Sequence, residues 1–123
     1  DLLTRWFRQG SCDFISERVT GKPLKSPYII TGNNFEQKIW EAFKKKMNGT
    51  DHEDWLYNKG LVVKGEEDLG YFMGYSICKY YYGHAHNKKQ AIRRIINLNY
   101  TKHAAVYRFF KDSQYEYKFK EGG

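Results

Sequence analysis

Apolar residues recur at spacings of three and four along most of this chain, a pattern that predicts amphipathic helices. Residues 2–20 carry it and are followed by Gly21, a typical helix stop. Residues 35–47 repeat the pattern directly after Asn33 and Asn34, either of which can cap a helix. The apolar spacing therefore predicts two helices in the N-terminal part of the chain, at residues 2–20 and 35–47.

Three further helices are predicted in the C-terminal half. The first spans residues 68–82, with acidic residues at its start and a glycine after its end. Asn87 is placed to cap the next helix, and Thr101 is placed to cap the last one. We therefore expect a mostly α fold of about five helices, in one domain over residues 1–123.

The remaining segments are predicted to be a loop, a short turn and an extended tail. A loop is expected through Pro27 and Gly32, because both residues disfavour the interior of a helix. Residues 50–57 have capping-box spacing and predict a short turn. Residues 115–119 alternate apolar and polar side chains, which predicts an extended tail. The predicted core consists of Trp6, Phe14, Ile39, Trp40, Phe43, Phe72, Ile92, Ile95 and Phe109.

Two glycines in the helix at 68–82 predict a close helix contact. Gly70 and Gly74 lie four residues apart and so share one face, and Gly10 offers a matching gap on the first helix. Two hypotheses follow for the tyrosines beside them. Tyr71 and Tyr75 either form the rim of the core, with the glycines accommodating a bulky side chain such as Trp6, or pair beside the first helix to grip a peptide backbone.

Charge adds one regional feature. The chain holds 21 basic and 14 acidic residues, and residues 69–111 contain eight of the basic residues and no acidic one. Such a segment could bind nucleic acid, an anionic lipid or an acidic partner, or it could be a solvated face. No apolar run reaches the roughly 18 residues of a membrane span.

The spacing of histidines and cysteines does not match a known metal-binding motif. His52 and Glu53 begin like the HExxH zinc-protease motif, but Leu56 stands where the second histidine is needed. His84 and His86 fall in a connection between helices, where solvated side chains are the simpler interpretation. Cys12 and Cys78 fall on helix faces that we expect to be buried or partly buried, and free cysteines there are usually unreactive.

An ordered set of short motifs resembles a known family. The motifs are QGSCDF at 9–14, VTGK at 19–22, IWEAF at 39–43, WLY at 55–57, DLGY at 68–71 with GY at 74–75, KQAI at 89–92 and DSQY at 112–115. Together they resemble the C-terminal half of a bacterial family of predicted zinc-dependent proteases, related to the gliding-motility lipoprotein B group.

That resemblance implies a zincin-like helical scaffold without the catalytic HExxH helix. In the family a glutamate supplies the third zinc ligand, and Gln9 stands at its position here, while Asp13 keeps the supporting acidic position. The resemblance therefore implies a chain that is inactive by itself and that we expect to hold no zinc. It also implies a cleft formed by Gln9, Asp13, Tyr71 and Tyr75 that faces a peptide, an upstream HExxH segment or a partner chain. The alternative function is a basic helical module that binds nucleic acid or an anionic partner through residues 69–111.

Overall fold

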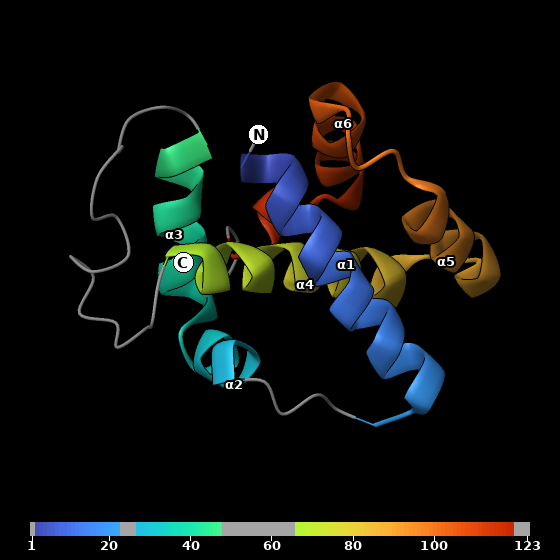
Figure 1. Ribbon diagram of the computed structural model, residues 1–123, viewed down its shortest axis with the longest axis horizontal. Coiled ribbons are helices and arrows are strands. Elements are labelled where there is room, and N and C mark those ends of the chain that lie inside the picture. Colours follow the sequence, from blue (N-terminus) through green and yellow to red (C-terminus); the bar gives the residue numbers. More distant parts are fainter. Residues whose placement is uncertain (1, 23–26, 48–65, 120–123) are drawn as a thin grey trace.

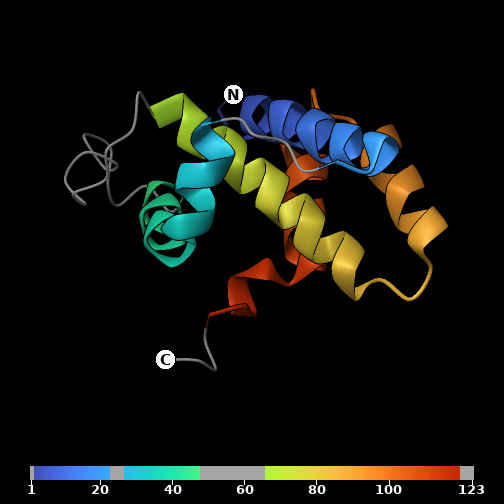
Figure 2. The same cartoon turned by 90° about the horizontal axis from the view of Figure 1, so that it is seen from below.

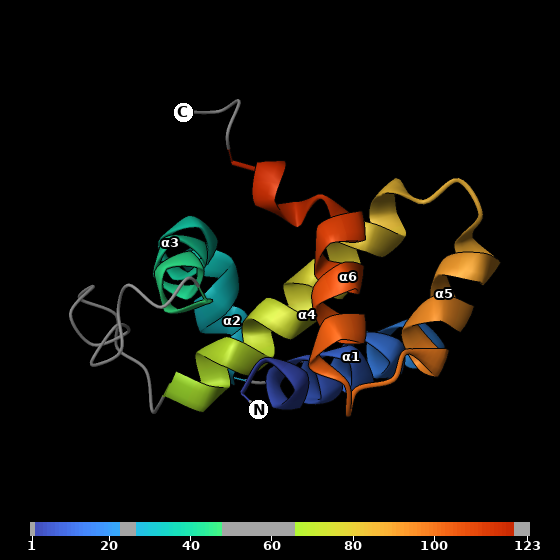
Figure 3. The same cartoon turned by 90° about the horizontal axis from the view of Figure 1, so that it is seen from above.

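Helix α4 (Glu66–His84) is the central element of the fold (Figure 1). The structure is a computed structural model that describes residues 2–22, 27–47 and 66–119. Figures 2 and 3 show α4 running obliquely through the middle of the molecule. The other described elements all contact it, and they are α1 (Leu2–Thr20), α2 (Pro27–Asn34), α3 (Glu36–Met47), α5 (Lys88–Asn97), α6 (His103–Ser113) and the 3₁₀ turn η2 (Tyr115–Tyr117).

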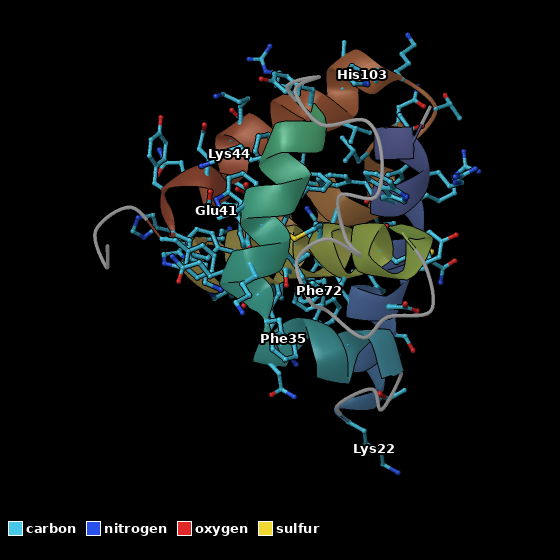
Figure 4. All side chains as sticks on the ribbon, turned by 90° about the vertical axis from the view of Figure 1, so that its left-hand side faces the viewer. Lys22, Phe35, Glu41, Lys44, Phe72 and His103 are labelled. Atoms are coloured by element: carbon cyan, nitrogen blue, oxygen red, sulfur yellow. The ribbon has the colours of Figure 1, made fainter. Side chains whose placement is uncertain are left out.

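The predicted α class is confirmed for the described residues, which contain helices and no strand. They form six α-helices, whereas about five were expected, because residues 27–34 form α2 and the predicted loop there is wrong. Proline suits the first position of a helix, where its missing N–H costs nothing. Gly32 lies against the ring of Phe72, so packing on α4 outweighs the low helix propensity of glycine. Figure 4 labels the Phe72 side chain, which lies beside α2.

The C-terminal tail also differs from its prediction. Gln114 adopts a left-handed conformation with φ of 59° and ends α6, and the chain then turns into η2. Tyr115 is buried, and its hydroxyl donates a hydrogen bond of 2.6 Å to Glu36 on α3. Lys118 pairs with the same carboxylate at 2.6 Å. This contact with α3 holds the tail in a turn instead of an extended strand.

Helix α4 is two residues longer at each end than the predicted 68–82, and of the three predicted N-caps two shift and one is confirmed. Asn87 caps α5, its side chain accepting a hydrogen bond of 3.0 Å from the backbone N–H of Gln90. The N-cap of α6 is Lys102 instead of Thr101, whose hydroxyl bonds Asn99. In α3 the first helical hydrogen bond is accepted by the carbonyl of Phe35, because the preceding asparagines belong to α2.

The described helices share one aromatic core. Every predicted core residue is buried except Ile92, which is partly buried and packs against the cluster. Edge-to-face and tilted ring pairs link the helices, including Phe7 with Phe109 and Trp40 with Tyr115. The turn predicted at 50–57 and the motif at His52 lie outside the described residues.

Candidate functional site

The close crossing of α1 over α4 positions the candidate site (Figure 1). A Cβ atom added to Gly10 would lie 2.5 Å from the carbonyl oxygen of Tyr71, and one added to Gly74 would lie 2.5 Å from the carbonyl oxygen of Trp6. Contacts this short leave no room for a side chain at either glycine position. The sequence-based prediction of a glycine contact between these helices is therefore confirmed.

Gly70 makes room for a bulky side chain, which is the other role that the sequence predicts for these glycines. A Cβ atom there would lie 2.5 Å from Cγ of the Trp6 ring, so Gly70 accommodates that bulky side chain. The structure thus contains both kinds of glycine packing, whereas the gripping of a peptide by the tyrosines stays a prediction. Gly10 and Gly74 bring the backbones together, and Gly70 makes space for an indole.

A polar strip on α1, formed by Gln9, Asp13 and Glu17, runs along the side of this crossing. The three residues follow one another at intervals of four, so they lie on one face of the helix. The Gln9 amide donates a hydrogen bond of 3.4 Å to the Asp13 carboxylate. Gln9 is exposed, while Asp13 and Glu17 are half-buried. The strip thus presents an amide to solvent and holds two carboxyl groups at the edge of the core.

Tyr75 joins the polar strip to α4. Its side chain is only 1% exposed, and its hydroxyl donates a hydrogen bond of 2.7 Å to Glu17. Burial raises the pKa of the Tyr75 phenol above its usual value, and Glu17 and Asp13 raise it further. Tyr75 is therefore a neutral donor that positions Glu17, and its ring belongs to the core instead of lining an open surface.

Tyr71 lies one turn earlier on α4 and is half-buried against the core. Its backbone carbonyl is one of the α4 backbone groups that Gly10 approaches. The four residues expected to form the cleft therefore gather at one crossing. Gln9 contacts Asp13, Tyr75 reaches the strip through Glu17, and Tyr71 contacts α1 through its backbone.

Asp13 is the titratable group of the strip with an unusual environment. Burial raises the pKa of its carboxyl group, and the neighbouring Glu17 adds to this effect. The hydrogen bond from Gln9 acts in the opposite direction because it favours the charged form. At its C-terminal end the strip meets a hollow of about 380 Å³, which is lined by Glu17, Arg18, Gly21 and Lys22.

The donors at this site do not fit a zinc ion. Gln9 offers a neutral amide, and the nearby carboxylates belong to one helix without a histidine among them. Across the described residues, no group of three His, Cys, Asp or Glu side chains is placed to hold a metal ion. His84 and His86 are exposed, as expected, and Nδ1 of His84 lies 3.0 Å from the carbonyl oxygen of Tyr80.

About half of the cations in the basic segment are engaged within the chain. Arg94 pairs with Asp112 at 2.7 Å, and Lys111 pairs with Glu116 at 2.6 Å. Lys88 donates to the last carbonyl groups of α4, and Lys79 lies over the Tyr75 ring. Within the described residues, no ion pair or side-chain hydrogen bond engages the charged groups of the other four, which are Lys89, Arg93, Lys102 and Arg108.

Two features of the site were not predicted from the sequence. One is Glu17, whose spacing of four from Asp13 is the signal that places both on a shared face. Cys12 was expected to be buried or partly buried, and that prediction is wrong because its thiol is exposed, whereas Cys78 is buried. Cys12 lies on the side of α1 that faces α5, where packing leaves a groove.

Comparisons with known proteins gave no match to this chain among family models, curated proteins or solved structures. In the described part of the chain, no helix combines the length and apolar character that crossing a membrane requires.

Proposed function

We propose that this chain is a zincin-like helical domain without a catalytic zinc site of its own, and that its polar strip forms one wall of a peptide-facing cleft. The observation that carries the proposal is the placement of Gln9, Asp13 and Glu17 on one face of α1, held against α4 by the glycine crossing. The resemblance in motif order supports the zincin-like assignment, and the QGSCDF segment contains the crossing glycine Gly10 and two of the three strip residues, Gln9 and Asp13.

The chemistry of the strip suits a peptide backbone. The Gln9 amide has a carbonyl oxygen and a second N–H beyond its bond to Asp13, so it can both accept from and donate to an amide of a ligand. The carboxyl group of Asp13 accepts hydrogen bonds at the rim, and Tyr75 fixes Glu17. A strip of this kind binds peptide but lacks the metal-activated water that hydrolysis by a zincin requires.

Peptide binding is the direct test. The probe is a fluorescent octapeptide of degenerate sequence, blocked at both ends and without charged residues. We expect Gln9→Ala and Asp13→Ala each to weaken its binding severalfold, because each removes a hydrogen-bonding partner. Gln37→Ala, at an exposed glutamine on α3, is the matched control and should change nothing. Equal affinity in all four proteins would contradict the proposal.

Zinc retention tests the inactive state. The chain is loaded with one equivalent of Zn²⁺ and dialysed against a mild chelator, and we expect no stoichiometric retention. When a helical peptide that contains HExxH is added, Gln9→Glu should raise the affinity for zinc because a carboxylate is a better ligand than an amide. Gln37→Glu is the control. Retention of one zinc by the unmodified chain would overturn the assignment of an inactive site.

The basic module remains the competing proposal. Its supporting observation is the set of four cationic side chains without an ion pair or side-chain hydrogen bond in the described residues, of which Lys89 and Arg93 lie on α5. The internal pairing of Arg94 and Lys111 weakens it, because those charges are partly neutralised within the chain. A salt titration with duplex DNA separates the two proposals.

A further inference from the structure

Helix α5 lies beside the C-terminal half of α1 (Figure 2), and an apolar groove runs between the two helices. It encloses about 540 Å³, and its lining includes Cys12, Ile15, Val19, Ile95, Ile96 and Tyr100. None of the polar-strip residues lines it. The groove is therefore a second surface of α1, separate from the candidate peptide site.

The walls of the groove carry unusually exposed apolar side chains. Val19 on α1 is 79% exposed and Ile96 on α5 is 57% exposed, and they stand on opposite walls. Ile15 is half-buried between them and the core. Apolar side chains gathered on both sides of one concave surface mark a binding site more often than scattered exposed ones do.

The charges around the groove have one sign. Arg8 lines it on the α1 side, and no acidic residue is among its lining residues. On α5, Lys89, Arg93 and Ile96 follow one another at spacings of four and three residues, so they share one face of the helix. Lys89 and Arg93 are exposed and lie along the outer edge of that face. None of these three cations forms an ion pair with a described residue. The rim is positive on both sides.

Shape and charge together indicate the occupant. A concave channel between two helices accepts the apolar stripe of a third helix, whereas a bilayer is contacted by a protruding apolar face. We propose that the α1–α5 groove binds an amphipathic helix of a partner protein, with its apolar stripe over Val19 and Ile96 and acidic residues facing Arg8, Lys89 and Arg93. This site is independent of the proposed peptide cleft.

The test uses two synthetic helices of about 16 residues with the same leucine stripe. One carries glutamates beside the stripe and the other carries lysines. We expect the glutamate helix to bind at least about tenfold more tightly, with an affinity that falls as salt rises. It should also slow the alkylation of Cys12 by iodoacetamide, because this exposed thiol lies in the groove.

Variants locate the binding surface. Val19→Asp should weaken binding of the glutamate helix at least about tenfold. The substitution places a carboxylate in the apolar contact, where it also repels the glutamates of the bound helix. Arg93→Glu should reduce the preference for glutamate over lysine. Phe35→Asp changes an exposed apolar residue on the junction of α2 and α3, and should leave the affinity unchanged. Circular dichroism confirms that each variant remains helical.

Several results would overturn this inference. Equal affinity for the glutamate and lysine helices would remove the charge argument, and an affinity unchanged by Val19→Asp would place the site elsewhere. Binding to phosphatidylserine vesicles without binding to the glutamate helix would identify a membrane surface instead. Self-association that Val19→Asp abolishes would identify a second copy of the chain as the occupant.

Discussion

Cys12 and Cys78 illustrate how far two residues of one type can differ in environment. Cys12 is exposed in the groove beside α5, while Cys78 is fully buried in α4. Burial raises the pKa of the Cys78 thiol, and reaction of a thiol requires both access and the thiolate form.

We predict that iodoacetamide modifies one thiol quickly in the native chain and the second only after denaturation. Mass spectrometry over time measures the two steps. Cys12→Ser should abolish the fast step and leave the slow one. Rapid modification of both thiols in the native chain would contradict the burial of Cys78.

Asp13 supplies a prediction on pH. Burial raises the pKa of the Asp13 carboxyl group above its ordinary value, so the folded chain favours its protonated form more than the unfolded chain does. A carboxyl group of this kind contributes stability that is complete below its unfolded pKa and is lost as pH rises through its folded pKa.

Asp13→Asn should therefore raise the unfolding midpoint at pH 7 and have little effect at pH 3, where the carboxyl group is protonated in both states. Denaturant titrations at the two pH values measure the difference. Asp112→Asn is the contrasting variant, because Asp112 is paired with Arg94 and its replacement should lower the midpoint at pH 7. A lower midpoint for Asp13→Asn at pH 7 would contradict the assigned direction.

At the scale of the elements, the fold depends most on the crossing of α1 and α4. Gly10→Ala and Gly74→Ala would each place a methyl group into the backbone of the other helix. We predict a loss of about 3 kcal/mol of unfolding free energy for each, as expected when a close-packed contact is overfilled.

Gly83→Ala is the matched control, because Gly83 also lies in α4 but a Cβ atom there meets nothing within 4 Å. It should be neutral or stabilise the chain by up to about 1 kcal/mol through higher helix propensity. Urea unfolding measures all three variants. Equal effects at Gly10 and Gly83 would refute the close crossing.

Periodicity predicted the long helices well and the short segments poorly. Apolar spacing found α1, and the paired glycines correctly indicated its contact with α4. Apolar spacing did not predict α2, because this helix depends on the contact between Gly32 and the ring of Phe72, a residue distant in sequence. It also missed the turn at Tyr115, which Glu36 of α3 holds in place. Such contacts between distant segments leave no local periodic signal.

At the scale of the whole molecule, the count of eight cations in residues 69–111 overstates the charge available to a partner. Four cationic side chains of this segment are without an ion pair or side-chain hydrogen bond in the described residues, and the other four are engaged within the chain. We predict that log affinity for a short DNA duplex falls with log salt at a slope no steeper than about −4.

Lys89→Ala and Arg93→Ala should each reduce that slope by about 1. Fluorescence anisotropy at several salt concentrations measures it. A slope near −7 would require all the basic residues of the segment to contact phosphate, and would favour the basic module over the peptide cleft.

The candidate site was only partly predictable at this scale. Motif spacing placed Gln9, Asp13, Tyr71 and Tyr75 in two segments, and the structure brings those segments to one crossing. The burial of Tyr75 and its bond to Glu17 depend on how deeply α4 packs under α1. The groove between α1 and α5 depends on the placement of a third helix, and no local pattern in either segment encodes it.

The most direct test of the proposed function is a map of where an uncharged peptide binds. Amide resonances of ¹⁵N-labelled protein are followed while the blocked, degenerate octapeptide is added. The account predicts that the largest shifts occur at Gln9, Asp13 and Glu17 on α1 and at Tyr71 on α4, and that Gln9→Ala reduces them. Shifts confined to residues 88–108, or to the lining of the α1–α5 groove, would contradict the assignment of the polar strip as the peptide site.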